Sequence, residues 1–135
     1  MKRYEDLETE DGKVVRYRRH ENGGGLVAAG ASVDPDAFVA DTAWIDPGAH
    51  VEAGAHIGPH GWVEPGAVVA SGARLGSHVH VGRDALVGSA ARLGARVDVG
   101  AGAQLARGVV VEPEAHVPAG AQVARRGFAP HVLAA

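Results

Sequence analysis

The chain contains no cysteine, one methionine, and only two residues each of tryptophan, tyrosine and phenylalanine. The absence of cysteine excludes disulfides, thiolate metal ligands and a cysteine nucleophile. With so few large side chains, any core must consist of small aliphatic residues. A single globular core of that kind buries little area per residue, so we expect an elongated shape.

Long hydrophobic runs are also missing, and the segment Met1–Leu7 lacks the apolar stretch of a secretion signal. We therefore expect a soluble cytoplasmic protein without a membrane partner. A net charge of -3 and a pI near 6.2 also disfavour a nucleic-acid partner.

Glycine is abundant, with 20 residues in a chain of 135. Such a bias often accompanies disorder, but 46% of the residues are hydrophobic, which is too many for a disordered chain. The glycines therefore belong to a folded protein of one domain.

A six-residue period runs through residues 27–128 without interruption, which makes 17 repeats. Every sixth residue from Val27 to Val123 is Val, Ile or Leu, and the residue four positions after each is Ala, Val or Gly. The small residue and the next aliphatic are two apart, so on a short strand both point inward and the residue between them points outward. Turn sequences such as Asp46-Pro47-Gly48 and Glu64-Pro65-Gly66 make the corners between strands.

This pattern resembles the hexapeptide-repeat superfamily, and pairs such as Ile57-Gly58, Leu75-Gly76 and Val81-Gly82 carry the resemblance. The resemblance implies an all-β fold, a left-handed parallel β-helix of triangular section with about 18 residues per coil. The 17 repeats then form about 5.7 coils, a prism roughly 27 Å tall.

The other segments are expected to cap this prism. Residues 1–26 are predicted to form an N-terminal β-hairpin cap and a glycine hinge at Gly23-Gly24-Gly25. Residues 27–128 are the β-helix, and 129–135 form a C-terminal cap or tail.

Residues 18 apart should lie above one another and form vertical ladders. One outward ladder consists of Trp44, Trp62, His80, Asp98 and His116, and its neighbour at the adjoining corner of Thr42, His60, His78, Arg96 and Glu114. At a spacing of about 4.8 Å, three imidazoles on this edge come within reach of one ion or one substrate. The edge formed by His60, His78, His80 and Asp98, with His116 as a further candidate, is the predicted catalytic site.

Three interpretations of this edge remain open. In the first, one imidazole is a general base that Asp98 orients. In the second, His80 and His116 bind a divalent metal such as zinc, with a missing ligand from a neighbouring subunit. In the third, the histidines are tolerated surface residues and the protein is a noncatalytic β-helical scaffold or assembly subunit, which the uninterrupted repeats favour.

The resemblance implies two activities, and the sequence departs from both. Hexapeptide acyltransferases use a histidine in a cleft between subunits and acyl-CoA as donor, but that histidine usually lies near a loop that interrupts the coil. Gamma-class carbonic anhydrases have two histidines spaced as His80 and His116 are, but their third histidine corresponds to Ala121 here. The leading hypothesis is an acyltransferase-like protein; the alternative is a carbonic-anhydrase-like protein with a degenerate metal site, and whether the chain is an enzyme stays open.

Two further expectations concern binding. Arg74 and Arg92, which are 18 apart, and Arg107 are candidates for the phosphates of a CoA-like cofactor. Val68 and Leu86 stack outward and make an apolar surface that is typical of an interface. The resemblance implies that this interface forms a homotrimer, with a small-molecule substrate as the other partner.

Overall fold

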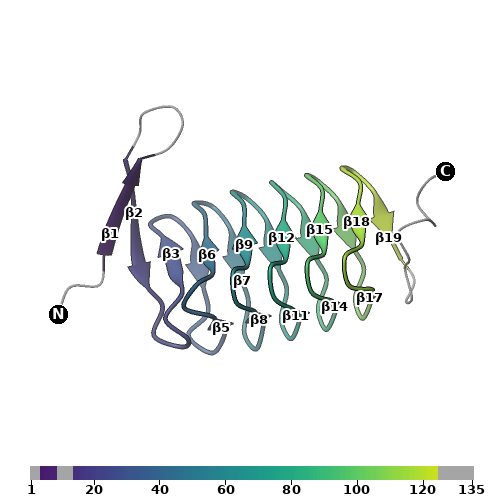
Figure 1. The fold of residues 1–135 in the computed structure, drawn as a ribbon, viewed down its shortest axis with the longest axis horizontal. Coiled ribbons are helices and arrows are strands. Elements are labelled where there is room, and N and C mark those ends of the chain that lie inside the picture. The colour runs from purple at the N-terminus through teal and green to yellow at the C-terminus, as the bar shows by residue number, and fades with distance from the viewer. Residues whose placement is uncertain (1–3, 9–13, 125–135) are drawn as a thin grey trace.

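The computed structural model describes residues 4–8 and 14–124, and within them every regular element is a strand. A hairpin of β1 (Tyr4–Glu8) and β2 (Val14–Arg19) precedes a stack of short strands, β3 to β19 (Figure 1). These strands form the left-handed parallel β-helix predicted from the sequence. The last residues of the final repeat and the predicted C-terminal cap lie outside the described residues.

Three sheets form the three faces of the prism, and each face is named here after a characteristic outward residue. The histidine face consists of β3 (Leu26–Ala28), β6 (Trp44–Ile45), β9 (Trp62–Val63), β12 (His80–Val81), β15 (Asp98–Val99) and β18 (His116–Val117). The arginine face consists of β5 (Phe38–Val39), β8 (His56–Ile57), β11 (Arg74–Leu75), β14 (Arg92–Leu93) and β17 (Val110–Val111). The leucine face consists of β4 (Ser32–Val33), β7 (His50–Val51), β10 (Val68–Val69), β13 (Leu86–Val87), β16 (Gln104–Leu105) and β19 (Gln122–Val123).

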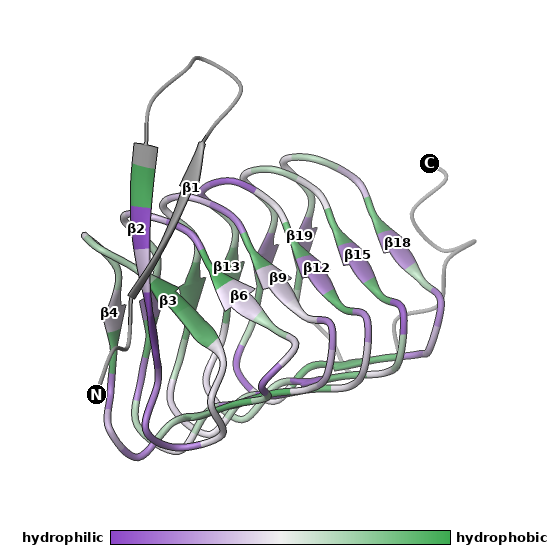
Figure 2. Ribbon diagram, turned by 60° about the vertical axis from the view of Figure 1, so that its left-hand side comes forward, coloured by the Kyte–Doolittle hydropathy of each residue, from purple (hydrophilic) through white to green (hydrophobic). Residues whose placement is uncertain are grey.

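The second residue of nearly every short strand points into the core. Ile45, Ile57 and Val81 are fully buried, and so is the small residue two positions before each aliphatic, such as Ala43. Figure 2 shows the resulting change from hydrophilic to hydrophobic along β12, β15 and β18. Because strand partners are 18 residues apart, the aliphatic side chains stack along the axis. Each buried Val, Ile or Leu contributes about 1.5–3 kcal/mol relative to an exposed position.

From Gly48 to Gly120, each corner between faces uses a residue with positive φ as the third residue of a turn. Glycine fills this position at Gly48 and Gly66, as the left-handed region favours. Other corners hold a residue with a side chain in the same conformation: His60, His78, Asp84, Ala90, Arg96 and Glu114. Five of these six corners carry a polar or charged side chain where glycine would be less strained.

The N-terminal hairpin extends the histidine face, because β2 pairs antiparallel with β3. The Tyr17 hydroxyl is buried and donates a hydrogen bond to Asp46 Oδ1 at 2.7 Å. Burial and this hydrogen bond raise the pKa of Tyr17, which keeps the hydroxyl protonated. Arg19 donates to the carbonyls of Gly24 and Asp41, each at 3.0 Å. These contacts anchor the hairpin to the first coils.

Candidate functional site

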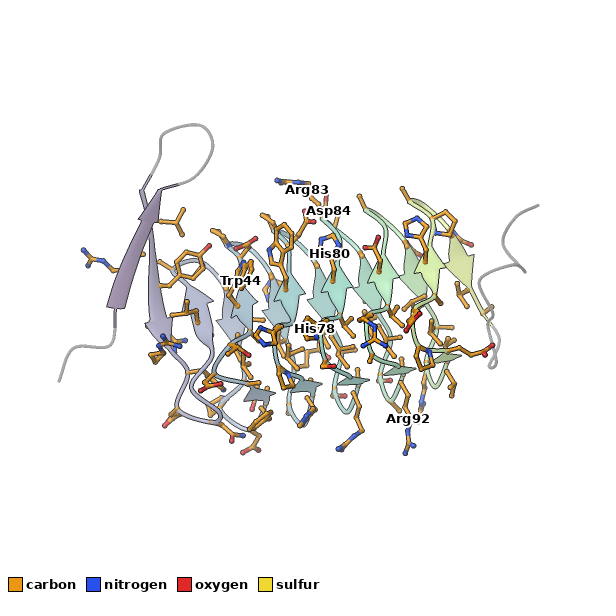
Figure 3. The ribbon with its side chains drawn as sticks, in the orientation of Figure 1. Trp44, His78, His80, Arg83, Asp84 and Arg92 are labelled. Atoms are coloured by element: carbon orange, nitrogen blue, oxygen red, sulfur yellow. The ribbon has the colours of Figure 1, made fainter. Side chains whose placement is uncertain are left out.

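The predicted outward ladder on the histidine face is present. Parallel pairing places each member directly above the previous one, in the order Trp44, Trp62, His80, Asp98 and His116. The side chains come from the first residue of each two-residue strand, which the alternation of the strand directs outward. Figure 3 shows His80 on this face, with His78 toward one edge.

Asp98 lies between two histidines and contacts both. The Nδ1–H of His80 donates to Asp98 Oδ1 at 2.7 Å, and the Nδ1–H of His116 donates to Asp98 Oδ2 at 2.9 Å. The His116 side chain is 63% exposed, and its Nε2 has no partner among the described residues. Asp98 therefore fixes one tautomer of His116 and leaves Nε2 as a proton acceptor facing solvent.

His80 is held from two sides, because its Nε2 also contacts a carboxylate oxygen of Glu64. Burial lowers the pKa of His80, but the hydrogen bonds to Asp98 and Glu64 and the charges of both carboxylates outweigh burial. The net result is a pKa raised above the usual 6.5. The two carboxylates thus favour the protonated form of His80.

Glu64 was not among the residues predicted for the site. It directly follows β9 and was assigned only to a corner, because the ladders compare residues 18 apart while Glu64 and His80 are 16 apart. The same spacing recurs one coil below, where Trp62 Nε1 donates to Asp46 Oδ2 at 2.7 Å. Both pairs can be found by searching the sequence for an acidic residue that directly follows a strand and lies 16 residues before its partner.

Aromatic stacking connects the site to the N-terminal hairpin. The Trp62 ring lies against His80, with centroids 4.6 Å apart, and against Trp44, with centroids 5.5 Å apart. Asp46 holds the Trp62 indole with one carboxylate oxygen and the Tyr17 hydroxyl with the other. The position of the indole beneath His80 thus depends on a buried contact to the hairpin.

His60 and His78 form a separate pair at the corner between the arginine and histidine faces. Their rings stack with centroids 4.5 Å apart. Within the described part of the chain, no hydrogen bond joins either ring to His80 or Asp98. The structure therefore divides the predicted four-residue edge into a carboxylate-bound group and a stacked pair.

The residues present do not fit a metal centre at His80 and His116. Both ring nitrogens of His80 contact carboxylates, and the two Nδ1 atoms converge on the same aspartate. Residues 4–8 and 14–124 contain no group of three or more His, Asp or Glu side chains that could hold an ion.

The three predicted cofactor-binding arginines lie on or beside the arginine face. Arg74 and Arg92 are exposed neighbours in register, and Arg107 lies in the turn before β17. The Arg92 side chain extends away from the prism (Figure 3) and borders a depression of about 620 Å³ that Ala90, Gly108 and Val110 also line. In the described residues no carboxylate pairs with any of these three guanidinium groups.

Comparison with known proteins gives structural matches only: no family model and no curated protein sequence matches the chain. A histidine-to-asparagine variant of perosamine N-acetyltransferase from Caulobacter crescentus, in complex with CoA and GDP-perosamine, is similar over 74% of this chain and 48% of its own, with 27% identity and a TM-score of 0.71. The chain belongs to the hexapeptide-repeat superfamily.

Two further matches are weaker. A structure of PerB from Caulobacter crescentus with CoA and GDP-perosamine matches at 26% identity and a TM-score of 0.48, over 71% of this chain and 49% of that chain. A hexapeptide transferase family protein from Anaplasma phagocytophilum matches at 18% identity and a TM-score of 0.32, over 76% and 70% of the respective chains. This hexapeptide-repeat protein spans about half the length of the two Caulobacter structures. In the described segments it has no helix suited to crossing a membrane.

The contacts of His80 predict a pH dependence for the stability of this hexapeptide-repeat protein. Because the folded pKa of His80 is raised, its stabilisation is complete below the unfolded pKa near 6.5 and is lost as the pH rises through the folded pKa. His80→Gln should therefore lower the melting temperature more at about pH 6 than at about pH 9. Thermal unfolding across this range measures the difference.

His56→Gln is the matched control. Burial and the neighbouring Arg74 lower the pKa of His56, so its contribution is present above about pH 6.5 and is lost as the pH falls. The two differences should thus change with pH in opposite directions. A pH-independent difference for His80→Gln would contradict the carboxylate-bound imidazolium.

Proposed function

We propose that this protein transfers an acyl group from acyl-CoA to an amine or hydroxyl acceptor, with His116 as the general base. The observation that carries the proposal is the Asp98–His116 contact, which leaves Nε2 of an exposed imidazole free to accept a proton. An acceptor bound over β18 meets this nitrogen without rearrangement of the fold.

The similarity to perosamine N-acetyltransferase supports this class of reaction. That protein is in complex with CoA and a nucleotide-linked amino sugar, and its β-helix matches this chain at 27% identity. A nucleotide-linked amino sugar is therefore the first acceptor class to test here.

The proposed step is a direct attack on the thioester. His116 Nε2 takes a proton from the acceptor while the acceptor nitrogen or oxygen bonds to the thioester carbonyl carbon. The tetrahedral intermediate then breaks its carbon–sulfur bond, and the His116 imidazolium returns the proton to the departing CoA sulfur. Asp98 holds the tautomer of His116 and stabilises the imidazolium that forms.

His80 has a positioning role in this scheme. Both of its ring nitrogens contact a carboxylate, of Asp98 or of Glu64, so neither nitrogen is free to take a proton from the acceptor. It occupies Oδ1 of Asp98, so Oδ2 remains directed at His116.

We place the donor phosphates at Arg74, Arg92 and Arg107. Two guanidinium groups stacked in register repel one another, and an anion between them would relieve this repulsion. We further propose a homotrimer whose intersubunit cleft brings the arginine face of one copy to the histidine face of the next. Val68 and Leu86 support it, because they form an apolar stack on a face whose outward strand residues include no Asp, Glu, Lys or Arg.

Donor binding is the direct test. Acetyl-CoA at 100 times its Kd should stabilise the folded protein by about 2.7 kcal/mol and raise its melting temperature accordingly. Arg92→Gln should weaken binding about tenfold, because charge-assisted hydrogen bonds to phosphate are lost. Thermal unfolding with and without acetyl-CoA measures the first effect, and calorimetric titration measures the second.

Arg83→Gln serves as the control, because Arg83 is exposed at a different corner, between β12 and β13. Equal loss of binding in both variants would contradict the assignment to the arginine face. Light scattering on the same samples tests the homotrimer and its intersubunit cleft. A monomeric mass would contradict both but would not contradict acyl transfer itself. Failure of any acyl-CoA to bind would instead favour the noncatalytic scaffold.

A further inference from the structure

The stacked imidazoles of His60 and His78 occupy a corner that their backbones hold firmly. The His60 N–H donates to Thr42 Oγ1 at 2.9 Å, and the His78 N–H donates to the Pro59 carbonyl at 2.8 Å. Both residues have φ near 60°. The turns therefore set the direction in which both side chains leave the corner.

Side chains at these two positions are costly, because glycine adopts the same conformation without strain. The corner that follows β6 uses Gly48 at the corresponding place in its turn. Strained positions of this kind often serve a function. Here the strain holds two imidazoles one coil apart on the same corner.

All four ring nitrogens of this pair are without partners in the part of the chain that the structure describes. The other nearby imidazoles differ, because both ring nitrogens of His80 and one ring nitrogen of His116 contact carboxylates. Neutral imidazole is the form that binds metal ions.

We propose that His60 and His78 form an exposed binding site for a divalent transition-metal ion of the Zn²⁺ and Cu²⁺ class. Adjacent coils lie about 4.8 Å apart, so modest side-chain rotations bring one nitrogen of each ring onto a common ion. The described residues offer no third His, Asp or Glu in such a group, so water or an exogenous ligand completes the coordination. Among first-row divalent ions, Cu²⁺ should bind most tightly.

The test uses the full chain without an affinity tag, titrated with Cu²⁺ and separately with Zn²⁺. Calorimetry should show one high-affinity Cu²⁺ per chain, and the electron paramagnetic resonance spectrum should show two equatorial nitrogen ligands. His60→Asn and His78→Asn should each weaken binding at least tenfold. Asparagine is chosen because it tolerates positive φ, so the corner is preserved while the ligand is removed.

His50→Asn is the matched control, because His50 is an exposed single histidine on the leucine face. His131→Asn controls for an imidazole outside the described residues. Both should bind Cu²⁺ as the wild type does. If the double variant His60→Asn/His78→Asn still binds Cu²⁺ with unchanged affinity and spectrum, or if the wild type binds none, the proposal is wrong.

Unchanged melting temperatures of the metal-free variants would show that lost binding reflects lost ligands and not lost structure. The metal site does not depend on acyl transfer, so acetyl-CoA binding should be the same in all these variants.

Discussion

Replacement of His116 by alanine should lower kcat for acyl transfer by a factor of about 10²–10⁴, the usual contribution of a positioned general base. The loss should fall on kcat, because His116 contacts the acceptor proton and not the donor phosphates. Release of CoA thiol from acetyl-CoA, with a panel of nucleotide-linked amino sugars and simple amines as acceptors, measures the rate. Acetyl-CoA should still raise the melting temperature of the variant as much as that of the wild type.

Two further variants test the role of Asp98 and the specificity of the effect for His116. Asp98→Asn should also lower kcat, because an amide no longer stabilises the His116 imidazolium. His50→Ala removes an exposed histidine from another face and should leave kcat unchanged. Full turnover in His116→Ala together with complete loss in His80→Ala would contradict the assignment of the base.

Leu105→Asp should destabilise the fold by about 4 kcal/mol or more, because it buries a carboxylate with no partner. Leu105 is 1% exposed and lies between the coils of β13 and β19. Domains have a total free energy of unfolding of about 5–15 kcal/mol, so this change removes a large part of the stability. Urea unfolding followed by circular dichroism measures the difference.

Gln104→Asp is the matched control one residue away on the same strand. Gln104 points outward and is exposed, so the same carboxylate should change stability by no more than about 0.5 kcal/mol. Similar effects at the two positions would contradict the inward and outward assignment of the repeat. The comparison thus tests the alternation that the six-residue period predicted.

The fold could be predicted almost completely from the repeat together with its resemblance to the hexapeptide-repeat superfamily. A small residue, an outward residue and an aliphatic recur without a break, and Ala43, Trp44 and Ile45 show the expected inward–outward–inward pattern. The 18-residue ladder of Trp62, His80 and Asp98 was likewise predicted, because parallel pairing in a regular coil leaves one register.

The site was predicted less well, because its contacts depend on side-chain rotamers. Glu64 reaches His80 diagonally across a corner, at a spacing that vertical ladders omit. The division between the bound His80 and the unpartnered pair of His60 and His78 also depends on which way each ring turns. A one-dimensional pattern assigns a residue to a face and a height but not to a partner.

The sequence by itself determined which side chains point inward, because the small residue and the aliphatic recur two positions apart in every repeat. The resemblance to the hexapeptide-repeat superfamily added the 18-residue coil, and with it the face and the height of each side chain. Only the tertiary structure decided which histidine nitrogens are free. The free nitrogens depend on hydrogen bonds between side chains that are 16 or 18 residues apart in the sequence. These bonds form only when the coils are stacked and each side chain has adopted its rotamer. His116 therefore becomes the proposed base, and His80 becomes its support.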